Sequence, residues 1–511
     1  MQVSLVSIFS NLPVNGLRII SSCLKQAGHD VNLIFLPQKH TERYDENVLN
    51  DLIKIVAGSD LVGITTMSNH FDNAVQLTEK VKQETAIPVV WGGVHPTIRP
   101  EESLGYADMV CVGEGEEATV EVVNKMEAGE DYTDTKGFWF KKDGEIIKNP
   151  VRPLIRDLDS LPFQDYDYEG HYVIHNNSIR PMDEELLNYH LRGDFMAAPT
   201  RGCPLACTFC VNNTLQKMYE EKKQFRGRSV DNIIEELVTI KAKLPFINHI
   251  TFDDDAFFSL SVEQIQEFSQ KFKSQVGFPL DIGGATPYSI SREKLGSLVE
   301  GGLTGLRMGI QSAAESTKVL YLRNHSNNYV EKAVQTIDEF RDHITPRYDI
   351  IVNNPWETEE DLSETLIFLS RIPTPYLLNL FSLTFYPATD LYDKAVEDGI
   401  IKDDLNDVYR ATYNVQADGT SGGLLGETYM NNLFYLVYVF ALYGHDVTEK
   451  IMSMLVARKN RPIMSRVMYF FMRQKASILL KKHLFAEIWK SVVANDQNRI
   501  KHWFHDEYAR D

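Results

Sequence analysis

Three of the five cysteines of this chain stand within one short segment. Residues 200–210 read TRGCPLACTFC and place Cys203, Cys207 and Cys210 in a C-x3-C-x2-C spacing. Thiolates bind iron strongly, and three of them can hold three corners of a [4Fe–4S] cube. Because the segment supplies no fourth thiolate, one iron of such a cluster stays open to a small molecule. Zinc normally takes a fourth Cys or His ligand at close spacing, so a zinc knuckle and three unconnected thiols are the weaker alternatives.

Composition predicts a well-packed, acidic protein. Its 511 residues suggest about three domains, and 43% hydrophobic with 24% charged residues is typical of soluble globular chains. The formal net charge of −19 disfavours a nucleic-acid partner, since phosphate binding needs a basic surface. Only Cys23 and Cys111 lie outside the cysteine segment, too few for a second cluster. So few thiols predict a reducing, cytoplasmic location.

No stretch predicts a transmembrane span. The apolar start, residues 3–9, lacks the basic flank and the length of a signal peptide, and we interpret it as a buried first strand. The longest late apolar run, residues 433–443, is too short to cross a bilayer.

Residues 1–130 alternate between strand and helix patterns. The predicted strands are 3–9, 31–36, 61–66, 89–91 and 109–112, and the predicted helices are 17–26, 49–57 and 71–84. Such alternation predicts a doubly wound parallel sheet with its ligand at the carboxyl ends of the strands. Two of these ends carry glycines, Gly92-Gly93 and the GEGE turn at 113–116, which allow close backbone approach to a ligand.

With the cysteine segment behind it, this region resembles the cobalamin-binding domain that precedes the barrel of many radical S-adenosylmethionine (SAM) enzymes. The resemblance implies a bound cobalamin and a cluster whose open iron chelates SAM. The implied cobalamin contacts are Asn11, Leu12, Val14, Thr65, Thr66, Ser68, Asn69, His70, Gly92, Gly93, His95 and Glu114.

One departure from the family pattern concerns the cobalt ligand. Many cobalamin domains carry a D-x-H-x-x-G loop whose His ligates cobalt, whereas residues 11–16 read NLPVNG. In place of that histidine, Asn69 or His70, which follow the predicted strand 61–66, would lie close to the cobalt. The alternatives are that Ser68 caps the following helix, that His70 is a surface residue, and that His95 is a turn residue.

Residues 131–190 read as a connector. Two alternating runs flank an Asp-Gly pair within residues 137–147, which predicts a hairpin. The acidic, aromatic stretch that follows resembles the linker between the two domains of this family.

Residues 191–400 alternate again. The predicted strands are 195–199, 249–252, 280–285, 306–310, 348–352 and 378–385, and the predicted helices between them include 230–243, 262–275 and 329–343. Six such units predict a partial (β/α)6 barrel with its catalytic end at the carboxyl edge of the strands.

Several strand ends match the places where radical SAM enzymes contact SAM. The resemblance implies SAM-binding roles for Phe209, Asp254, Asp255, Gln311, Ser312, Arg323 and Asn353. Acceptors such as Asp254 and Asp255 would orient the SAM ammonium, although clustered acids also suit a helix N-terminus. Arg323 would meet the SAM carboxylate, or it is a plain surface arginine.

Two segments depart from the family's motifs at a glycine. Residues 353–358 read NNPWET where the family usually has G-x-P-x-E-T, so the path of that loop is open. Residues 385–389 read FYPAT in place of the usual Pro-Gly-Thr turn.

Residues 401–511 resemble no family we can name. Helical periodicity runs through 428–442, 448–456, 463–483 and 484–494, and basic residues outnumber acidic ones from Leu455 onward. We interpret this region as a helical lid on the barrel. The alternative is a substrate-binding or membrane-contacting cap built on the amphipathic segment 464–473.

Together these patterns predict a cytoplasmic, cobalamin-dependent radical SAM methyltransferase. A 5′-deoxyadenosyl radical would activate a carbon of a small-molecule or lipid-like substrate, and a flavodoxin or ferredoxin would supply electrons. The alternative with the same cofactors is a cyclase or ring-rearranging enzyme. A non-catalytic sensor is disfavoured by the SAM motifs, and a tRNA methylthiotransferase by the lack of further cysteines and of a basic surface.

Overall fold

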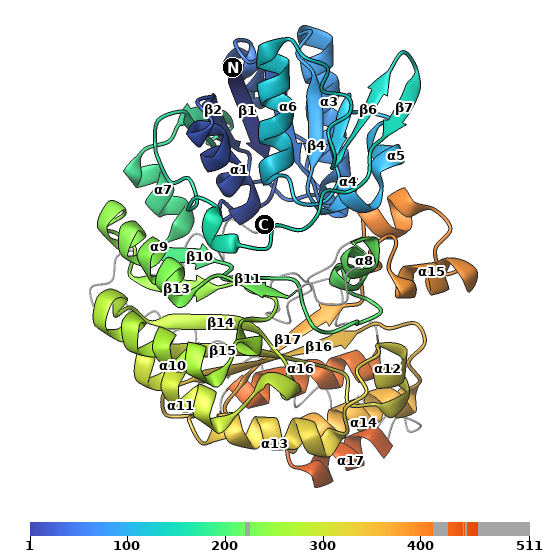
Figure 1. Cartoon of the computed structure of the whole chain (residues 1–511). Coiled ribbons are helices and arrows are strands. Elements are labelled where there is room, and N and C mark those ends of the chain that lie inside the picture. The colour runs from blue at the N-terminus through green and yellow to red at the C-terminus, as the bar shows by residue number, and fades with distance from the viewer. Residues whose placement is uncertain (220–224, 412–427, 443, 445–446, 458–511) are drawn as a thin grey trace. The chain divides into compact units, whose positions relative to one another are not determined.

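The computed structural model describes residues 1–219, 225–411, 428–442, 444 and 447–457 (Figure 1). The chain divides into two compact units. The first comprises residues 1–248 and 385–411, and the second comprises residues 249–384 and the chain from 412 onward.

A nine-stranded sheet forms the centre of the first unit, with strand order β7-β6-β5-β4-β3-β1-β2-β8-β9. Its parallel core comprises β1 (Gln2–Ser7), β2 (Asp30–Phe35), β3 (Leu61–Thr65), β4 (Val89–Gly92) and β5 (Met109–Cys111). Because β1 lies between β2 and β3, the chain changes direction across the sheet there. In such folds ligands bind at the carboxyl ends of the strands that flank this switch point.

Helices cover both faces of this core, as the alternation predicts. They are α1 (Asn15–Gln26), α2 (Glu46–Val56), α3 (Phe71–Glu84), α4 (Val94–Ile98), α5 (Pro100–Ser103) and α6 (Glu116–Ala128). Helix α1 packs beside α6, and α2 packs beside α3. The strands between them are buried along nearly their whole length, since helices on both faces of the sheet remove them from water.

Two hairpins extend the sheet at its edges. The predicted hairpin is β6 (Phe138–Lys142) and β7 (Glu145–Lys148), and β6 pairs antiparallel with β5. A second hairpin, β8 (His171–His175) and β9 (Ser178–Pro181), pairs with β2 and was not predicted. Its turn residues Asn176 and Asn177 both have positive φ, which two-residue hairpin turns require and which asparagine tolerates.

The rest of the first unit carries the cysteine segment. It contains α7 (Glu184–Leu191), β10 (Asp194–Ala197), β11 (Thr200–Arg201), α8 (Val211–Met218), β12 (Arg226–Gly227) and α9 (Val230–Lys243). The returning segment 385–411 adds α15 (Asp390–Glu397) and the π-helical turn η6 (Leu405–Tyr409).

Five parallel strands lie side by side in chain order in the second unit. They are β13 (His249–Phe252), β14 (Leu280–Ala285), β15 (Leu303–Gln311), β16 (Thr345–Val352) and β17 (Leu377–Ser382). Their helices are α10 (Val262–Lys271), α11 (Arg292–Gly301), α12 (Glu315–Leu320), α13 (Asn327–Asp338) and α14 (Glu359–Leu369). With β10, each of the six strands predicted for the barrel segment is a strand.

Of the predicted C-terminal helices, the first two are confirmed as α16 (Tyr429–Leu442) and α17 (Glu449–Ala457). Helix α16 packs on β17 and α14, which explains its apolar sequence. The predicted helices 463–483 and 484–494, with the amphipathic segment 464–473, lie outside the described residues. Within the described part of the chain, no helix has both the length and the apolar character of a membrane span.

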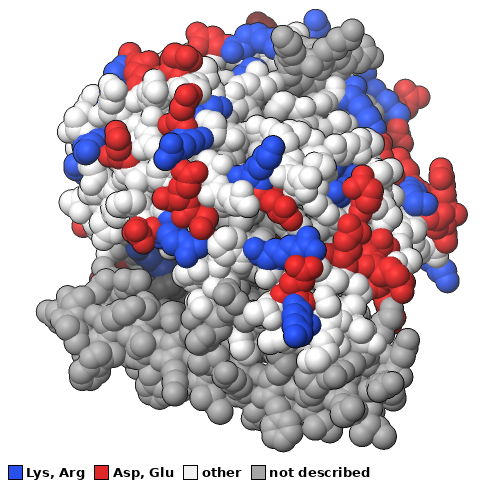
Figure 2. Space-filling view, turned by 90° about the horizontal axis from the view of Figure 1, so that it is seen from below, with Lys and Arg blue, Asp and Glu red and all other residues white. Residues whose placement is uncertain are grey.

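On the face drawn in Figure 2, acidic and basic side chains of the described residues are interspersed. Together with the net charge of −19, this face offers nucleic-acid phosphates no continuous basic surface among those residues.

Candidate active site

The cysteine segment lies between a short strand pair and a helix. β11 pairs antiparallel with β12, and α8 begins directly after the last cysteine. The Cys210 amide donates a hydrogen bond to the Cys207 carbonyl at 3.1 Å, and the Gln216 side chain on α8 donates to the carbonyls of Cys203 and Leu205. The first turns of α8 therefore hold the backbone of the segment.

Cys207 is buried, whereas Cys203 and Cys210 are half-buried. Among the described residues, no three His, Cys, Asp or Glu side chains are arranged together as a metal site. Ligation of the cluster by these three cysteines therefore stays a prediction that rests on the motif.

Segment 385–411 contacts both α8 and the helices of the sheet domain. The Asn213 side chain donates to Asp390 at 3.0 Å, and the Leu391 amide donates to the carbonyl of Thr208, between two cysteines, at 3.0 Å. The Tyr409 hydroxyl donates to Glu102 at 2.7 Å, and Arg99 donates to the Tyr392 hydroxyl at 2.7 Å. The sequence carries no local signal for these contacts, which join residues far apart in the chain.

The GEGE turn is tied to the strands that lead into the cysteine segment. The Glu114 carboxylate accepts hydrogen bonds from Arg201 at 3.1 Å, from Arg226 at 3.0 Å and from the Ile155 amide at 2.9 Å. Burial alone would raise the pKa of Glu114, but the Arg226 hydrogen bond and the charges of both arginines leave it below its ordinary value. Glu114 therefore holds this junction as a carboxylate, and its predicted cobalamin contact stays a prediction.

The ends of β3 and β4 are locked together where cobalamin contacts are predicted. The Thr66 amide donates to the Gly92 carbonyl at 2.8 Å, and the His95 amide donates to the Thr66 carbonyl at 3.2 Å. Gly93 has a φ of +102°, and a Cβ there would lie 2.8 Å from the Thr66 oxygen. Only glycine fits this position, and Thr65 lies half-buried beside it.

His95 and Ser68 differ from the simplest sequence interpretation. His95 is fully buried in α4, and its ring packs against Phe71 and Tyr409 with centroids 5.2 and 5.1 Å away. Burial, followed by the charge of Arg99, lowers the pKa of His95 to about 3. Its Nδ1 shares a hydrogen bond with the Ser68 hydroxyl at 3.0 Å, and no side chain caps η1 (Ser68–His70) or α3. His95 is therefore a buried helix residue and not a turn residue, and Ser68 is not a helix cap.

In the loop after β1, Asn11 is exposed while Leu12 and Val14 are buried. The Leu12 carbonyl accepts a hydrogen bond from Arg18, a fully buried arginine of α1 that sequence reasoning missed. Arg18 also donates to the Asp165 carbonyl at 2.7 Å. The loop is therefore fixed from within the unit, so the loop's exposed atoms are the ones available to a ligand.

The predicted SAM-binding residues of the second unit follow three strands. After β13, Asp254 is buried and its Oδ1 accepts a hydrogen bond from the Ala256 amide at 2.8 Å, whereas Asp255 is exposed. Gly284 of β14 has a φ of +70°, and any Cβ there would collide with the Asp254 carbonyl. The turn of acids therefore packs directly on the backbone of the neighbouring strand.

Gln311 and Arg323 both lie beside Gly309, near the end of β15. Gln311 has a φ of +71° at a register shift against β16. Arg323 is 9% exposed, and its Nη1 lies 3.4 Å from the Gly309 carbonyl that it bonds. Arg323 is therefore not a plain surface arginine.

Ser312 faces a buried carboxyl group that sequence reasoning did not single out. Its hydroxyl donates to Glu357 at 3.1 Å and shares a hydrogen bond with the Thr365 hydroxyl at 3.1 Å. Thr317 donates to the same Glu357 oxygen at 2.9 Å. Burial raises the pKa of Glu357 to about 7. In this structure the Ser312 hydroxyl thus supports the loop, and its SAM contact stays a prediction.

The two positions where the sequence lacks the family's glycine keep a left-handed backbone. Asn353 has a φ of +59° and Ala388 a φ of +61°. The Asn353 side chain is held by Asn431 of α16 at 2.7 Å and by Ser382 at 3.2 Å. The sequence did not settle the path of the loop that begins at Asn353. The structure shows the left-handed conformation that a glycine would adopt there, and asparagine tolerates this conformation.

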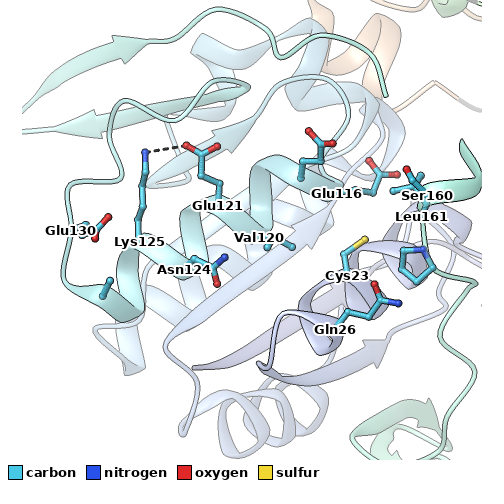
Figure 3. A pocket seen from close by; sticks show the side chains of 13 residues that line it. Cys23, Gln26, Glu116, Val120, Glu121, Asn124, Lys125, Glu130, Ser160 and Leu161 are labelled. Carbon is cyan, nitrogen blue, oxygen red and sulfur yellow. Dashed lines mark ion pairs between the residues drawn. The ribbon is translucent and has the colours of Figure 1, made fainter. Parts of the chain in front are cut away.

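A surface groove of about 570 Å³ lies between α1, α6 and the connector (Figure 3). Its lining includes Cys23, Glu116, Glu117 and Glu121, and Glu121 pairs with Lys125 at 3.0 Å. Burial, followed by the charge of Glu116, raises the pKa of Cys23 to about 12, so this cysteine is a neutral thiol and a poor nucleophile.

Family models match both parts of the chain. The B12 binding domain matches residues 1–123, and the radical SAM superfamily matches residues 198–369. The chain is a cobalamin-binding radical SAM protein. The cofactors of this class are cobalamin, SAM and a [4Fe–4S] cluster, as the resemblance to the family implied. The predicted fold class is confirmed as well.

Known relatives of this radical SAM protein cover most of its length. An uncharacterised methyltransferase of Pyrococcus horikoshii is 28% identical, over 76% of this chain and 80% of its own. Bacteriochlorophyllide d C-8(2)-methyltransferase of Chlorobaculum tepidum is 24% identical, over 88% and 90%. Among solved structures, the cobalamin-dependent SAM radical enzyme OxsB with aqua-cobalamin bound has a TM-score of 0.68 at 15% identity, covering 99% of this chain and 84% of its own. That likeness concerns the fold.

Proposed function

We propose that this radical SAM protein is a cobalamin-dependent C-methyltransferase acting on an unactivated carbon of a small-molecule or lipid-like substrate. The observation that carries the proposal is the similarity, over most of both chains, to two proteins named as methyltransferases. When bound, SAM and cobalamin supply the radical and the methyl group.

The chain's own residues would then hold the cofactors and the substrate and keep water away from them. Cys203, Cys207 and Cys210 would hold the cluster, and the neutral, buried surroundings of the β3 and β4 ends suit an amide-rich corrin ligand. In the second unit, the exposed Asp255 and the buried Arg323 offer an acceptor and a donor for the two charged ends of a methionine moiety. Chemistry of this kind needs no acid–base pair, but it needs positioned reactants and little water.

The second, less favoured candidate is a cyclase or ring-rearranging enzyme with the same cofactors. It is supported by a relative from Synechocystis named as an anaerobic magnesium-protoporphyrin IX monomethyl ester cyclase, which is 26% identical over 39% of this chain. The substrate of such an enzyme would lose a hydrogen atom, as in methyl transfer, but would close or rearrange a ring without gaining a carbon.

Label transfer from SAM tests the proposal. Full-length protein is reconstituted anaerobically with iron, sulfide and hydroxocobalamin and then given a low-potential reductant, candidate substrates and SAM with a labelled methyl group. A methyltransferase moves the label into product and releases 5′-deoxyadenosine, whereas a cyclase releases 5′-deoxyadenosine and leaves the product unlabelled.

Matched cysteine variants control this assay. Cys203→Ala should lose 5′-deoxyadenosine formation because it removes a cluster ligand, while Cys23→Ala, in the surface groove, should keep it. Formation of 5′-deoxyadenosine in Cys203→Ala at the wild-type rate would refute the cluster assignment and the function built on it.

A further inference from the structure

His70 occupies the switch point of the nine-stranded sheet. It ends the short helical turn η1 that comes after β3, and its ring lies 5.5 Å from the ring of Phe9, which follows β1. The ring of His40, in the loop after β2, lies 6.0 Å from His70. Aromatic side chains from three neighbouring strand ends thus gather where doubly wound folds bind their ligands.

The hydrogen bond between His70 and Asn69 defines which ring nitrogen of His70 can bind a ligand. Nδ1 lies 2.9 Å from Asn69 Oδ1, which is an acceptor, so Nδ1 carries the proton and Nε2 keeps its lone pair. The side chain is only 4% exposed, and Nε2 is buried without a hydrogen-bond partner among the residues that the structure describes. A buried polar atom normally has a partner, so an unsatisfied lone pair at a ligand site indicates a missing ligand.

The hydrogen bond at Nδ1 favours the same interpretation. An imidazole whose one nitrogen donates to an oxygen acceptor while the other keeps its lone pair is the usual form of a metal-binding histidine.

Other candidates for this role fit less well. The loop 11–16 after β1 contains no histidine. The Nε2 of His95 is likewise buried without a hydrogen-bond partner among the described residues, but it lies 3.6 Å from the Glu102 carboxylate, and its ring is enclosed by Phe71 and Tyr409.

We propose that Nε2 of His70 is the protein's axial nitrogen ligand to the cobalt of bound cobalamin, with Asn69 as the positioning residue that fixes the imidazole tautomer. The proposal rests on cobalamin binding by the first unit and is independent of which reaction the enzyme carries out.

Electron paramagnetic resonance of the cob(II)alamin-loaded, full-length protein tests this assignment. Mild reduction that leaves the iron–sulfur cluster oxidised isolates the cobalt signal. An axial ¹⁴N nucleus splits each cobalt line into a triplet, and ¹⁵N converts the triplet into a doublet. Protein made with ¹⁵N-imidazole histidine should therefore show doublets, and His70→Asn should lose the splitting from the protein. His40→Asn and His95→Asn should keep the doublets.

Three results would overturn the proposal. Triplets that persist in labelled protein would identify the cofactor's own dimethylbenzimidazole as the ligand. Absence of any nitrogen splitting would mean that no nitrogen is bound, and loss of the doublets in His40→Asn or His95→Asn would assign another histidine. If His70→Asn fails to take up cobalamin, the labelled wild type and the two control variants still decide. Because the readout needs no turnover, it stays interpretable if the proposed methyl transfer is wrong.

Discussion

Ala388 holds a backbone conformation that alanine rarely adopts. Its φ of +61° lies in the left-handed region, and its carbonyl accepts a hydrogen bond from Thr214 of α8 at 2.8 Å. A Cβ in this region costs roughly 1 kcal/mol. The Cβ methyl group of Ala388 therefore strains the turn that contacts α8, the helix that follows the cysteine segment.

Replacing Ala388 by glycine should relieve that strain. We expect Ala388→Gly to raise the free energy of unfolding by about 1 kcal/mol, measured as the shift of the first urea transition. Ala395→Gly, inside α15, is the matched control and should lower it by a similar amount because glycine disfavours helices. A destabilised Ala388→Gly variant would contradict the assigned backbone.

Glu357 is a buried carboxyl group whose protonation couples to stability. Burial raises its pKa from the ordinary 4.5 to about 7, and the hydrogen bonds from Thr317 and Ser312 offset this only in part. The folded state therefore binds the proton more tightly than the unfolded state between pH 4.5 and 7. The contribution of Glu357 to the free energy of unfolding accordingly falls as pH rises through this window.

A neutral isostere should remove that loss. We expect Glu357→Gln to be about 1–2 kcal/mol more stable than the wild type at pH 8 and close to it at pH 5. The measurement is urea unfolding at both pH values. Glu359→Gln, on an exposed side chain at the start of α14, is the control and should change the free energy of unfolding little at either pH. Equal effects of Glu357→Gln at both pH values would mean that the protonation of Glu357 does not change between pH 5 and pH 8.

At the scale of elements, charge pairs connect β5 to β11 and β12. Glu114 follows β5, and its carboxylate contacts Arg201 of β11 and Arg226 of β12. Arg226 is 9% exposed, so removing one partner leaves the other charged and poorly solvated. Breaking such a pair is costly, whereas removing both charges costs less than the sum.

A double-mutant cycle measures this link. We expect Arg226→Met to destabilise the first unit by about 3 kcal/mol, and Glu114→Gln combined with Arg226→Met to cost less than the two single changes added together. Urea unfolding gives the coupling energy. Additive effects would show that the carboxylate and the guanidinium do not interact, and a changed cobalamin affinity in Glu114→Gln alone would support its predicted ligand contact.

Secondary-structure elements were largely predictable, because each depends on a local pattern. The strands of both units follow apolar runs, and the β6–β7 hairpin follows its Asp-Gly turn. The β8–β9 hairpin was missed since its strands contain His171, His175 and Arg180, which weaken the apolar alternation; the Asn176-Asn177 turn was the available signal.

At the scale of the whole molecule, the chain forms two compact units, so we expect cobalamin and SAM to stabilise different parts of it. A ligand that binds only the folded state stabilises it by RT ln(1 + [L]/Kd), about 2.7 kcal/mol at one hundred times Kd. Cobalamin contacts are predicted at the strand ends of the first unit, and most of the predicted SAM contacts lie in the second.

We therefore expect cobalamin to protect peptides from residues 1–130 against proteolysis, with little change in 249–384. SAM alone should protect peptides of the second unit. Anaerobic limited proteolysis with mass spectrometry of apo and loaded protein measures both effects. Equal protection of all peptides by cobalamin alone would mean that the two units unfold as one.

The sequence alone determined the class of this protein. Cysteine spacing and strand–helix alternation are local properties. They predicted a cluster-binding segment and two α/β folds in order, and the resemblance to the family assigned the cofactors to them. Tertiary structure alone decided which polar groups meet. Arg18 bonds Asp165 across 147 residues, and Tyr409 bonds Glu102 across 307. Such partners depend on how sheets and helices pack, and so do the burial of His70 and the left-handed turns at Asn353 and Ala388.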